Sequence, residues 1–436
     1  MRRALLPAVL ASVVLNTGCT KVQRGAPLSM PDDGSGGEVA LRFSVVALDA
    51  PPYAEAFEKF HAQQDGIRVS LEPIPAQGYL EKLKVLIANG EAPDVFVFDD
   101  EPFLALQQRG AFLDLTPYIE EDDFDLDRFW KTNVELCTVD GRVYGLPMDG
   151  GAEVLYYNKD LFDAAGLDYP SSEWTWDDFV DAAKALTRDT DGDGITDQYG
   201  YLCTTDWWPK WLPWIWMCGG RVLNDDRTEC LMDSPEAIAG LRWYSDLMLK
   251  HEVAPLASEG AMTGMGRGQL FGTGRVAMFG GLPVAYREFK EYRHINWDVC
   301  PYPIGPKGVR ITRYTGCPYV IYARTKHPRE CWMLLKFLEE PEIESIIVRA
   351  YKFPVQRAVA ESDVWLNPRT PWHEEVFTQA VADARVQPLI PEYDEMGDLV
   401  QDELDRLIAG RQSAEETGRN IKRRVDRLLM RDRTAT

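Results

Sequence analysis

The sequence predicts an α/β fold, and three observations lead to it. Between residues 39 and 98, runs rich in β-branched and aromatic residues alternate with amphipathic runs of helical periodicity. The run at 93–98 is short and apolar, which is typical of a strand buried on both faces of a parallel sheet. With 436 residues, the chain is long enough for two or three domains that have cores of their own.

The first strands also point to candidate ligand contacts. The expected elements alternate between strand and helix in the order 39–47, 52–64, 67–72, 78–89 and 93–98. On parallel sheets, ligands bind outside the carboxyl ends of the strands. Asp49, Asp99 and Asp100 stand at such ends and are candidate binding residues. Their alternative role is to cap the helix that follows.

The rest of the chain continues the pattern with longer connections. Residues 113–127 are acidic and read as a loop, and 147–151 reads as a bend. Thr175 is a candidate N-cap, and Ser413 with Glu416 has the spacing of a capping box. Further strands are expected at 142–145, 153–158, 276–279 and 319–323, and helices at 159–165, 176–187, 235–250, 266–274, 329–339, 397–410 and 413–431.

Residues 206–220 contain five of the thirteen tryptophans. Three of them, at 207, 211 and 214, share one helical face, which is typical of a core. Trp208 and Trp216 fall outside that stripe, and Pro209 and Pro213 interrupt the helix. Aromatic faces also pack against sugar rings, so the cluster is either core or, in part, a stacking surface for a sugar.

The N-terminus predicts export. Arg2 and Arg3 precede an apolar run at 4–15, and small residues then lead to Cys19. This order resembles a bacterial lipoprotein signal over 1–18, in which Cys19 is lipidated, although Asn16 departs from the usual pattern. Ordinary secretion is the alternative. Residues 19–37 are rich in Gly, Pro and Ser and read as a flexible tether.

Charge and cysteine content exclude several classes of protein. The formal net charge of −22 is unfavourable for binding nucleic acid. None of the seven cysteines after Cys19 forms a CxxC pair, which argues against structural zinc. Cys218 and Cys230 flank an expected turn and could form a disulfide, while the odd number leaves at least one thiol free.

A second acidic cluster has the spacing of a calcium loop. Gly194 stands at position 6, where EF-hand loops turn sharply, but position 12 is Gly200 instead of a glutamate. Positions 1, 3, 5, 7 and 9 are Asp189, Asp191, Asp193, Ile195 and Asp197. The loop is therefore a candidate structural Ca²⁺ site, with a solvated Asp-Gly turn as the alternative.

Several longer motifs resemble one family. They include APDVFVFDD at 92–100, GRVYGLPMDGGAEVLYYNKDLFDAAGL at 141–167, WTWDDFVDAAKAL at 174–186 and GRVAMFGG at 274–281. Together they resemble the extracellular solute-binding proteins of ABC importers, in the carbohydrate-binding family that includes maltose-binding protein. The resemblance covers nearly all of the chain after the tether.

The resemblance implies a two-lobed fold with a ligand cleft between the lobes. Crossovers are then expected near 147–151, 297–301 and 339–342. One lobe would comprise 38–148 with 299–339, and the other 149–298 with 340–436. The implied function is to capture a sugar or oligosaccharide by cleft closure and deliver it to a membrane permease. The protein would act as a monomer, with its membrane contact made through the lipid anchor.

The resemblance also implies site residues. Trp207 and Trp208 would be the rings nearest the cleft, whereas Trp211, Trp214 and Trp216 would belong to the core. The other implied ligand contacts, beside Asp49, Asp99 and Asp100, are Gly280, Gly281, Thr315, Gly316, Phe353 and Arg357.

Two other classes remain open from the sequence. A secreted glycosidase would need two carboxylates across the scissile bond, and the many acidic residues permit such a pair. The chain has no HExxH or GxSxG motif, and the GxGxxA-like run at 272–277 precedes a strand instead of following one. A protein-binding lipoprotein is the third class. We expect no enzyme activity and no required cofactor.

Overall fold

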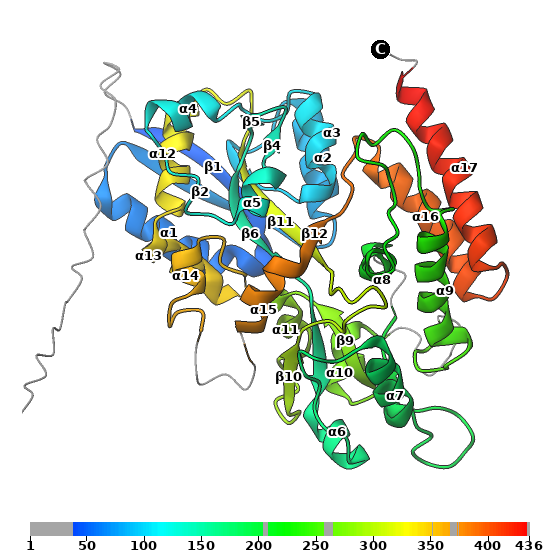
Figure 1. The fold of residues 1–436 in the computed structure, drawn as a ribbon. Helices are drawn as coiled ribbons and strands as arrows, with labels where there is room; N and C mark the ends of the chain where they lie inside the picture. The colour runs from blue at the N-terminus through cyan, green and yellow to red at the C-terminus, as the bar shows by residue number, and fades with distance from the viewer. Residues whose placement is uncertain are drawn as a thin grey trace, which may run out of the picture.

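The computed structural model describes residues 38–203, 208–256, 265–350, 352–366, 373 and 375–433, with backbone only at 208–209 and 432–433. Figure 1 shows two α/β lobes, one built on a six-stranded sheet and the other on a four-stranded sheet. We call these the first and the second lobe. No helix in the described ranges is long and apolar enough to cross a membrane.

The sheet of the first lobe starts with three parallel strands, as predicted. β1 (Val39–Val46) lies between β2 (Ile67–Ile74) and β3 (Val95–Val97). β11 (Thr312–Ile321) then runs antiparallel to β3, so the complete sheet is mixed. β11 also pairs with β6 (Leu146–Ala152) and β12 (Ala384–Val386).

Helices cover this sheet and bury its apolar side chains. Phe43 of β1 packs against Tyr53 and Phe57 of α1, and all three are buried. The helices and 3-10 turns of this lobe are η1 (Ala47–Asp49), α1 (Ala50–Gln63), α2 (Tyr79–Asn89), α3 (Asp100–Gln108), α4 (Thr116–Glu121), α5 (Lys131–Leu136), α12 (Pro328–Leu338), α13 (Pro341–Ile347), η4 (Val348–Ala350) and α14 (Arg357–Ala360). A small hairpin, β4 (Thr138–Val139) with β5 (Arg142–Val143), follows α5.

The second lobe has the strand order β10-β7-β9-β8. These strands are β7 (Val154–Asn158), β8 (Tyr199–Tyr201), β9 (Val276–Gly281) and β10 (Trp297–Cys300). Around them lie α6 (Lys159–Ala165), α7 (Trp176–Leu186), η2 (Trp208–Trp211), α8 (Leu212–Met217), α9 (Pro235–Leu249), α10 (Arg267–Gly272), η3 (Pro283–Ala285), α11 (Tyr286–Phe289), α15 (Glu375–Ala380), η5 (Val381–Asp383), α16 (Tyr393–Ile408) and α17 (Ala414–Arg433). One core joins α7, α8, α9, α16 and α17.

Local sequence signals correctly located several helix ends. Thr175 accepts a hydrogen bond from the Asp178 N–H, and the Asp178 carboxylate accepts one from the Thr175 N–H, which completes a capping box. Ser413 likewise accepts the Glu416 N–H. The loop prediction for 113–127 was wrong in part, because Thr116–Glu121 form α4 after Asp114 accepts the Thr116 N–H.

The lobe boundaries differ from the predicted ones at several places. Ala384–Val386 pair with β11 in the first-lobe sheet, and Val299 and Cys300 belong to β10 of the second lobe. Residues 147–151 are not a bend but part of β6, since Gly151 pairs with Thr315 and Gly150 with Gly316 across the sheet. The chain therefore leaves the first lobe at Glu153. Residues 341–347 form α13, which packs on α1 in the first lobe, and not in the second lobe as expected.

The predicted disulfide is also wrong. Cys218 and Cys230 are both free and buried. Cys218 ends α8, whereas Cys230 bridges to Leu223 across the turn and donates its N–H to Asp426. Each thiol therefore faces a different environment.

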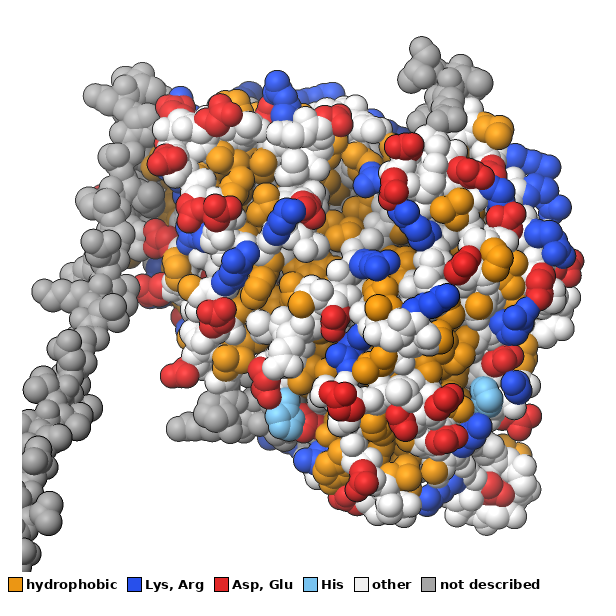
Figure 2. Space-filling model, in the orientation of Figure 1, with side chains coloured by type: hydrophobic (Ala, Val, Ile, Leu, Met, Phe, Trp, Pro, Cys, Tyr) orange, Lys and Arg blue, Asp and Glu red, His pale blue; other side chains and the backbone are white. Residues whose placement is uncertain are grey.

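Surface charge is mixed on the visible face. Figure 2 shows acidic and basic side chains interspersed over both lobes, with basic side chains gathered along the edge formed by α17. Hydrophobic side chains are concentrated toward the middle of this face, where the lobes meet.

Candidate functional site

A cavity of about 150 Å³ lies between the lobes, outside the carboxyl end of β3. The first lobe supplies most of its wall, and the second lobe closes it with the turn after β9, Leu282–Val284. The first-lobe wall consists of Asp99, Asp100, Glu101, Asp149, Gly150, Gly151, Thr315, Gly316, Cys317, Lys352 and Phe353.

Asp99 and Asp100 are the acidic residues at the junction of β3 and α3. Asp100 is buried and accepts hydrogen bonds from the Thr315 hydroxyl at 3.1 Å and the Gly316 N–H at 3.3 Å. Burial raises the pKa of Asp100 well above its usual value. Burial and then the Glu101 carboxylate raise the pKa of Asp99 to about 6. The Asp99 side chain makes no capping bond, so the capping alternative does not describe it.

Among the residues that the structure describes, Lys352 is the only cationic side chain in the cavity wall. Its ammonium lies 3.2 Å from Asp49 and 3.0 Å from Asp149. Asp149 also accepts the Phe353 N–H at 3.0 Å, which ties the segment that carries Lys352 to β6. Asp49 does not line the cavity, but it orients Lys352 and is itself paired with Arg287. Sequence reasoning missed Lys352, because nothing in its local sequence distinguishes it from a surface lysine.

The remaining predicted contacts divide into two groups. Thr315, Gly316 and Phe353 line the cavity, as Asp99 and Asp100 do. Arg357 does not, since its guanidinium lies over the Trp130 ring at 5.5 Å. Gly280 and Gly281 end β9 just before the cavity wall.

Gly280 has a packing reason for its lack of a side chain. A Cβ atom there would lie 1.9 Å from the Tyr302 hydroxyl, so any other residue would displace that ring. Its carbonyl accepts hydrogen bonds from Lys210 at 3.3 Å and from Arg267 at 3.4 Å. These contacts, and not a wall of the cavity, account for Gly280.

The tryptophan-rich stretch lies largely in the second-lobe core. Trp211 and Trp214 are fully buried, and Trp214 stacks on Trp243 with ring centroids 4.3 Å apart. Trp216 is buried as well and lies at the edge of a second groove. Trp207 lies outside the described residues, and the Trp208 side chain is likewise not among them.

The acidic loop lies between α7 and β8, in the second lobe and away from the cavity. Carboxylate oxygens of Asp189, Asp191 and Asp197 come within 4.8 Å of one another. Asp193 is not in this group, and its carboxylate accepts the Ile195 N–H. The Ile195 side chain is exposed.

The family model that describes bacterial extracellular solute-binding proteins matches residues 47–344. The chain belongs to this family. A relative from Brucella abortus (strain 2308), which its name describes as a candidate binding protein without stating a ligand, is 27% identical over 92% of this chain and 96% of its own length.

Two further comparisons concern proteins with named ligands. An arabinooligosaccharide-binding protein of Halalkalibacterium halodurans is 30% identical over 197 residues, which are 44% of this chain and 42% of that protein. An ABC substrate-binding protein from Listeria monocytogenes, solved in complex with cycloalternan, is 23% identical and covers 90% of this chain and 99% of its own, with a TM-score of 0.80. The second likeness establishes the two-lobed fold of this solute-binding protein.

The solute-binding protein also has a larger groove, of about 760 Å³, between its lobes. Its walls come from the carboxyl-terminal part of α3, the β4–β5 hairpin, the turn after α8 and the segment 385–389. The groove shares no residue with the smaller cavity. Apart from Trp216, none of the residues singled out in the sequence lines it, so the smaller cavity is the candidate ligand site.

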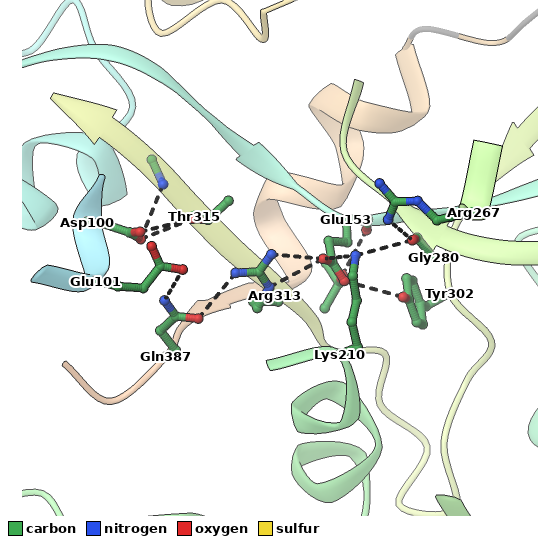
Figure 3. A network of polar contacts seen from close by, with 12 residues as sticks. Asp100, Glu101, Glu153, Lys210, Arg267, Gly280, Tyr302, Arg313, Thr315 and Gln387 are labelled. Carbon is green, nitrogen blue, oxygen red and sulfur yellow. Dashed lines mark hydrogen bonds and ion pairs between the residues drawn. The ribbon is translucent and has the colours of Figure 1, made fainter. Parts of the chain in front are cut away.

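Behind the cavity, a chain of buried polar side chains runs from one lobe to the other (Figure 3). Glu153 is its centre and contacts Lys210 at 2.7 Å and Arg313 at 3.0 Å. Burial alone would raise the pKa of Glu153, but the charges of Lys210 and Arg313 outweigh it and lower the pKa to about 2. Sequence reasoning missed all three residues.

Proposed function

We propose that this solute-binding protein captures a sugar unit in the cavity between its lobes and delivers it to an ABC permease. The observation that carries the proposal is the inter-lobe position of a cavity lined by carboxylates, a hydroxyl and glycine backbone. Such groups accept hydrogen bonds from sugar hydroxyls. The arabinooligosaccharide-binding relative supports the same class of ligand.

The dimensions of the cavity favour a single ring. A protein cavity of about 150 Å³ accommodates a six-membered ring such as benzene, and this one has about that volume. We propose that one ring of a sugar or oligosaccharide enters it. Binding would stabilise the closed arrangement by its preference for that state, with no covalent step.

The charge of the cavity predicts which sugars are rejected. Asp99, Asp100 and Glu101 form no ion pair with any side chain in the described ranges, and Lys352 is already neutralised by Asp49 and Asp149. An anionic sugar would therefore meet uncompensated like charge. We propose that the ligand is neutral or cationic.

A saccharide panel tests both proposals. Arabinose, galactose, glucose, maltose, lactose and maltotetraose are compared by calorimetry and thermal shift, with galacturonate and glucuronate as matched acidic controls. At least one neutral sugar should bind, and a concentration of 100 times its Kd should raise the free energy of unfolding by about 2.7 kcal/mol. Silence across the panel, or hydrolysis of one member, would reject the binding function; preference for a uronate would reject the charge argument.

We further propose that Cys19 is lipidated and holds the protein, as a monomer, at the outer side of the cell membrane. The signal-like residues 1–18 and the Gly/Pro/Ser-rich segment 19–37 support this, although both lie outside the described residues. The known extracellular location of the family agrees with export.

We also propose that the 189–197 loop holds a structural Ca²⁺. Three convergent carboxylates of Asp189, Asp191 and Asp197 fit the oxygen ligands that calcium prefers. Asp189 accepts the N–H groups of Gly192 and Gly194, which shapes the loop around the carboxylates. Position 12 contributes no carboxylate, because it is a glycine, Gly200 of β8, so the affinity should be modest.

A further inference from the structure

Three segments that connect the lobes meet at one side chain, Arg313. The first connection is Glu153, between β6 of the first lobe and β7 of the second. The second runs from β10 to β11, and Arg313 is the second residue of β11. The third leaves β12 at Gln387 and leads to α16, which packs in the second-lobe core.

Arg313 contacts the other two connections directly. Its guanidinium donates to the Glu153 carboxylate at 3.0 and 3.3 Å and to the Gln387 side-chain oxygen at 3.2 Å. The backbone reinforces the first contact, since the Glu153 N–H donates to the Arg313 carbonyl at 3.0 Å. Thr312 donates its hydroxyl to the Glu153 carbonyl at 2.7 Å. The first two connections are thus joined to each other by side chains and backbone.

Each end of this network reaches a wall of the ligand cavity (Figure 3). On the first-lobe side, Gln387 donates to Glu101 at 3.3 Å, and Glu101 lines the cavity beside Asp100. On the second-lobe side, Glu153 holds Lys210, which donates to the Gly280 carbonyl two residues before Leu282 of the opposite wall.

The network also contains buried ion pairs, which makes it sensitive to rearrangement. Lys210 and Arg313 both pair with the Glu153 carboxylate. Arg313 and Glu153 are completely buried, and Lys210 is nearly so. Separating one member would leave a buried charge without a partner, which is costly. Gln387 is neutral, so breaking its hydrogen bonds to Arg313 and Glu101 separates no ion pair.

We propose that Arg313 is a positioning residue that sets ligand affinity without touching the ligand. By joining the three connections, it limits the lobe orientations and so the fraction of molecules whose cavity walls are in place for binding. The apparent affinity of a binding protein scales with that fraction. Only the effect on ligand affinity rests on the function proposed above. The effect on lobe orientation does not, because the distance between the lobes can be measured without any sugar.

The test measures the distance between the lobes in the sugar-free protein. Fluorophores are attached through non-canonical amino acids at Val85 of α2 and Asp181 of α7, which are both exposed, so the native cysteines stay untouched. Single-molecule energy transfer then gives the distance distribution. Gln387→Leu should broaden this distance distribution and shift its mean, because leucine cannot form the hydrogen bonds that join Arg313 to Glu101.

The matched control is Gln356→Leu. Gln356 and Gln387 are both 2% exposed, but Gln356 bonds to Arg128 and the Glu339 carbonyl within the first lobe. Its removal should leave the distance distribution unchanged. An unchanged distribution in folded Gln387→Leu, or an equal change in both variants, would overturn the proposal.

Arg313→Lys provides an independent readout if Gln387→Leu does not fold. Lysine keeps the positive charge beside Glu153 but lacks the fork that reaches Glu153 and Gln387 together. It should broaden the distribution while retaining the fold by circular dichroism. A wild-type distribution in folded Arg313→Lys would equally contradict the proposal. Failure of the saccharide panel would leave this result intact, so the two proposals fail separately.

Discussion

Asp99 combines partial burial with three carboxylate neighbours in the same cavity wall. Burial and, after it, the Glu101 carboxylate raise the pKa of Asp99 to about 6. An acid whose pKa is raised in the folded state binds more protons there than in the unfolded chain, so its contribution to stability falls as pH rises from about 4 to about 6. The site thus carries an electrostatic cost at neutral pH that a hydroxyl-rich ligand can offset by donating to the carboxylates.

Replacing Asp99 by asparagine tests this cost. Asp99→Asn should raise the free energy of unfolding at pH 7.5 by about 1–2 kcal/mol, because the neutral amide avoids the buried charge. The gain should shrink at pH 4.5, where Asp99 is largely protonated. Urea unfolding at both pH values provides the measurement, with the exposed Asp181→Asn as control. A variant less stable than wild type at pH 7.5 would refute the argument.

The acidic loop between α7 and β8 is held by its own backbone bonds. Asp189 accepts two N–H groups and Asp197 accepts the N–H and hydroxyl of Thr190. These bonds bring carboxylates of like charge together on an exposed loop, and the cation proposed above would relieve their mutual repulsion.

Calcium should therefore stabilise this element. Adding Ca²⁺ is expected to raise Tm with a Kd of about 10⁻⁴–10⁻³ M, in the range of extracellular modules. Asp191→Asn should abolish most of the response, while Mg²⁺ should give less, because it demands a tighter octahedral set of ligands. Differential scanning fluorimetry after EGTA treatment measures both. No shift up to about 10 mM Ca²⁺ would remove the site.

At the scale of the molecule, the two inter-lobe spaces have unequal sizes, about 150 Å³ for the cavity and about 760 Å³ for the groove. Both lobes contribute to the wall of the cavity, and Leu282–Val284 form its second-lobe side. We expect a sugar to enter the proposed site when the lobes lie further apart, because hinge closure then brings this turn over the ligand.

Small-angle scattering should detect that arrangement. The sugar-free protein is expected to have a larger radius of gyration than the protein saturated with the neutral sugar found in the panel. The bound curve should match the structure described above. A uronate that does not bind serves as the control and should leave the curve unchanged. Identical curves with and without the bound sugar would contradict closure.

Much of the fold was predictable because its signals are local. Helical periodicity, the Thr175 capping box and the buried indoles of Trp211 and Trp214 depend on residues a few positions apart. The position of Asp99 and Asp100 at a strand end also follows from one local pattern, and the structure places both in the cavity. The sequence by itself therefore determined many of the helices and strands, the burial of Trp211 and Trp214, and the place of Asp99 and Asp100 at a strand end.

Tertiary structure alone decided how distant segments meet. Asp149 and Phe353 are 204 residues apart, Glu153 and Arg313 are 160 apart, and Glu101 and Gln387 are 286 apart. The pairing of β6 with β11 moved the lobe boundary to Glu153 for the same reason. Such contacts leave no periodic trace in either segment, because each depends on a partner that the chain reaches only after folding.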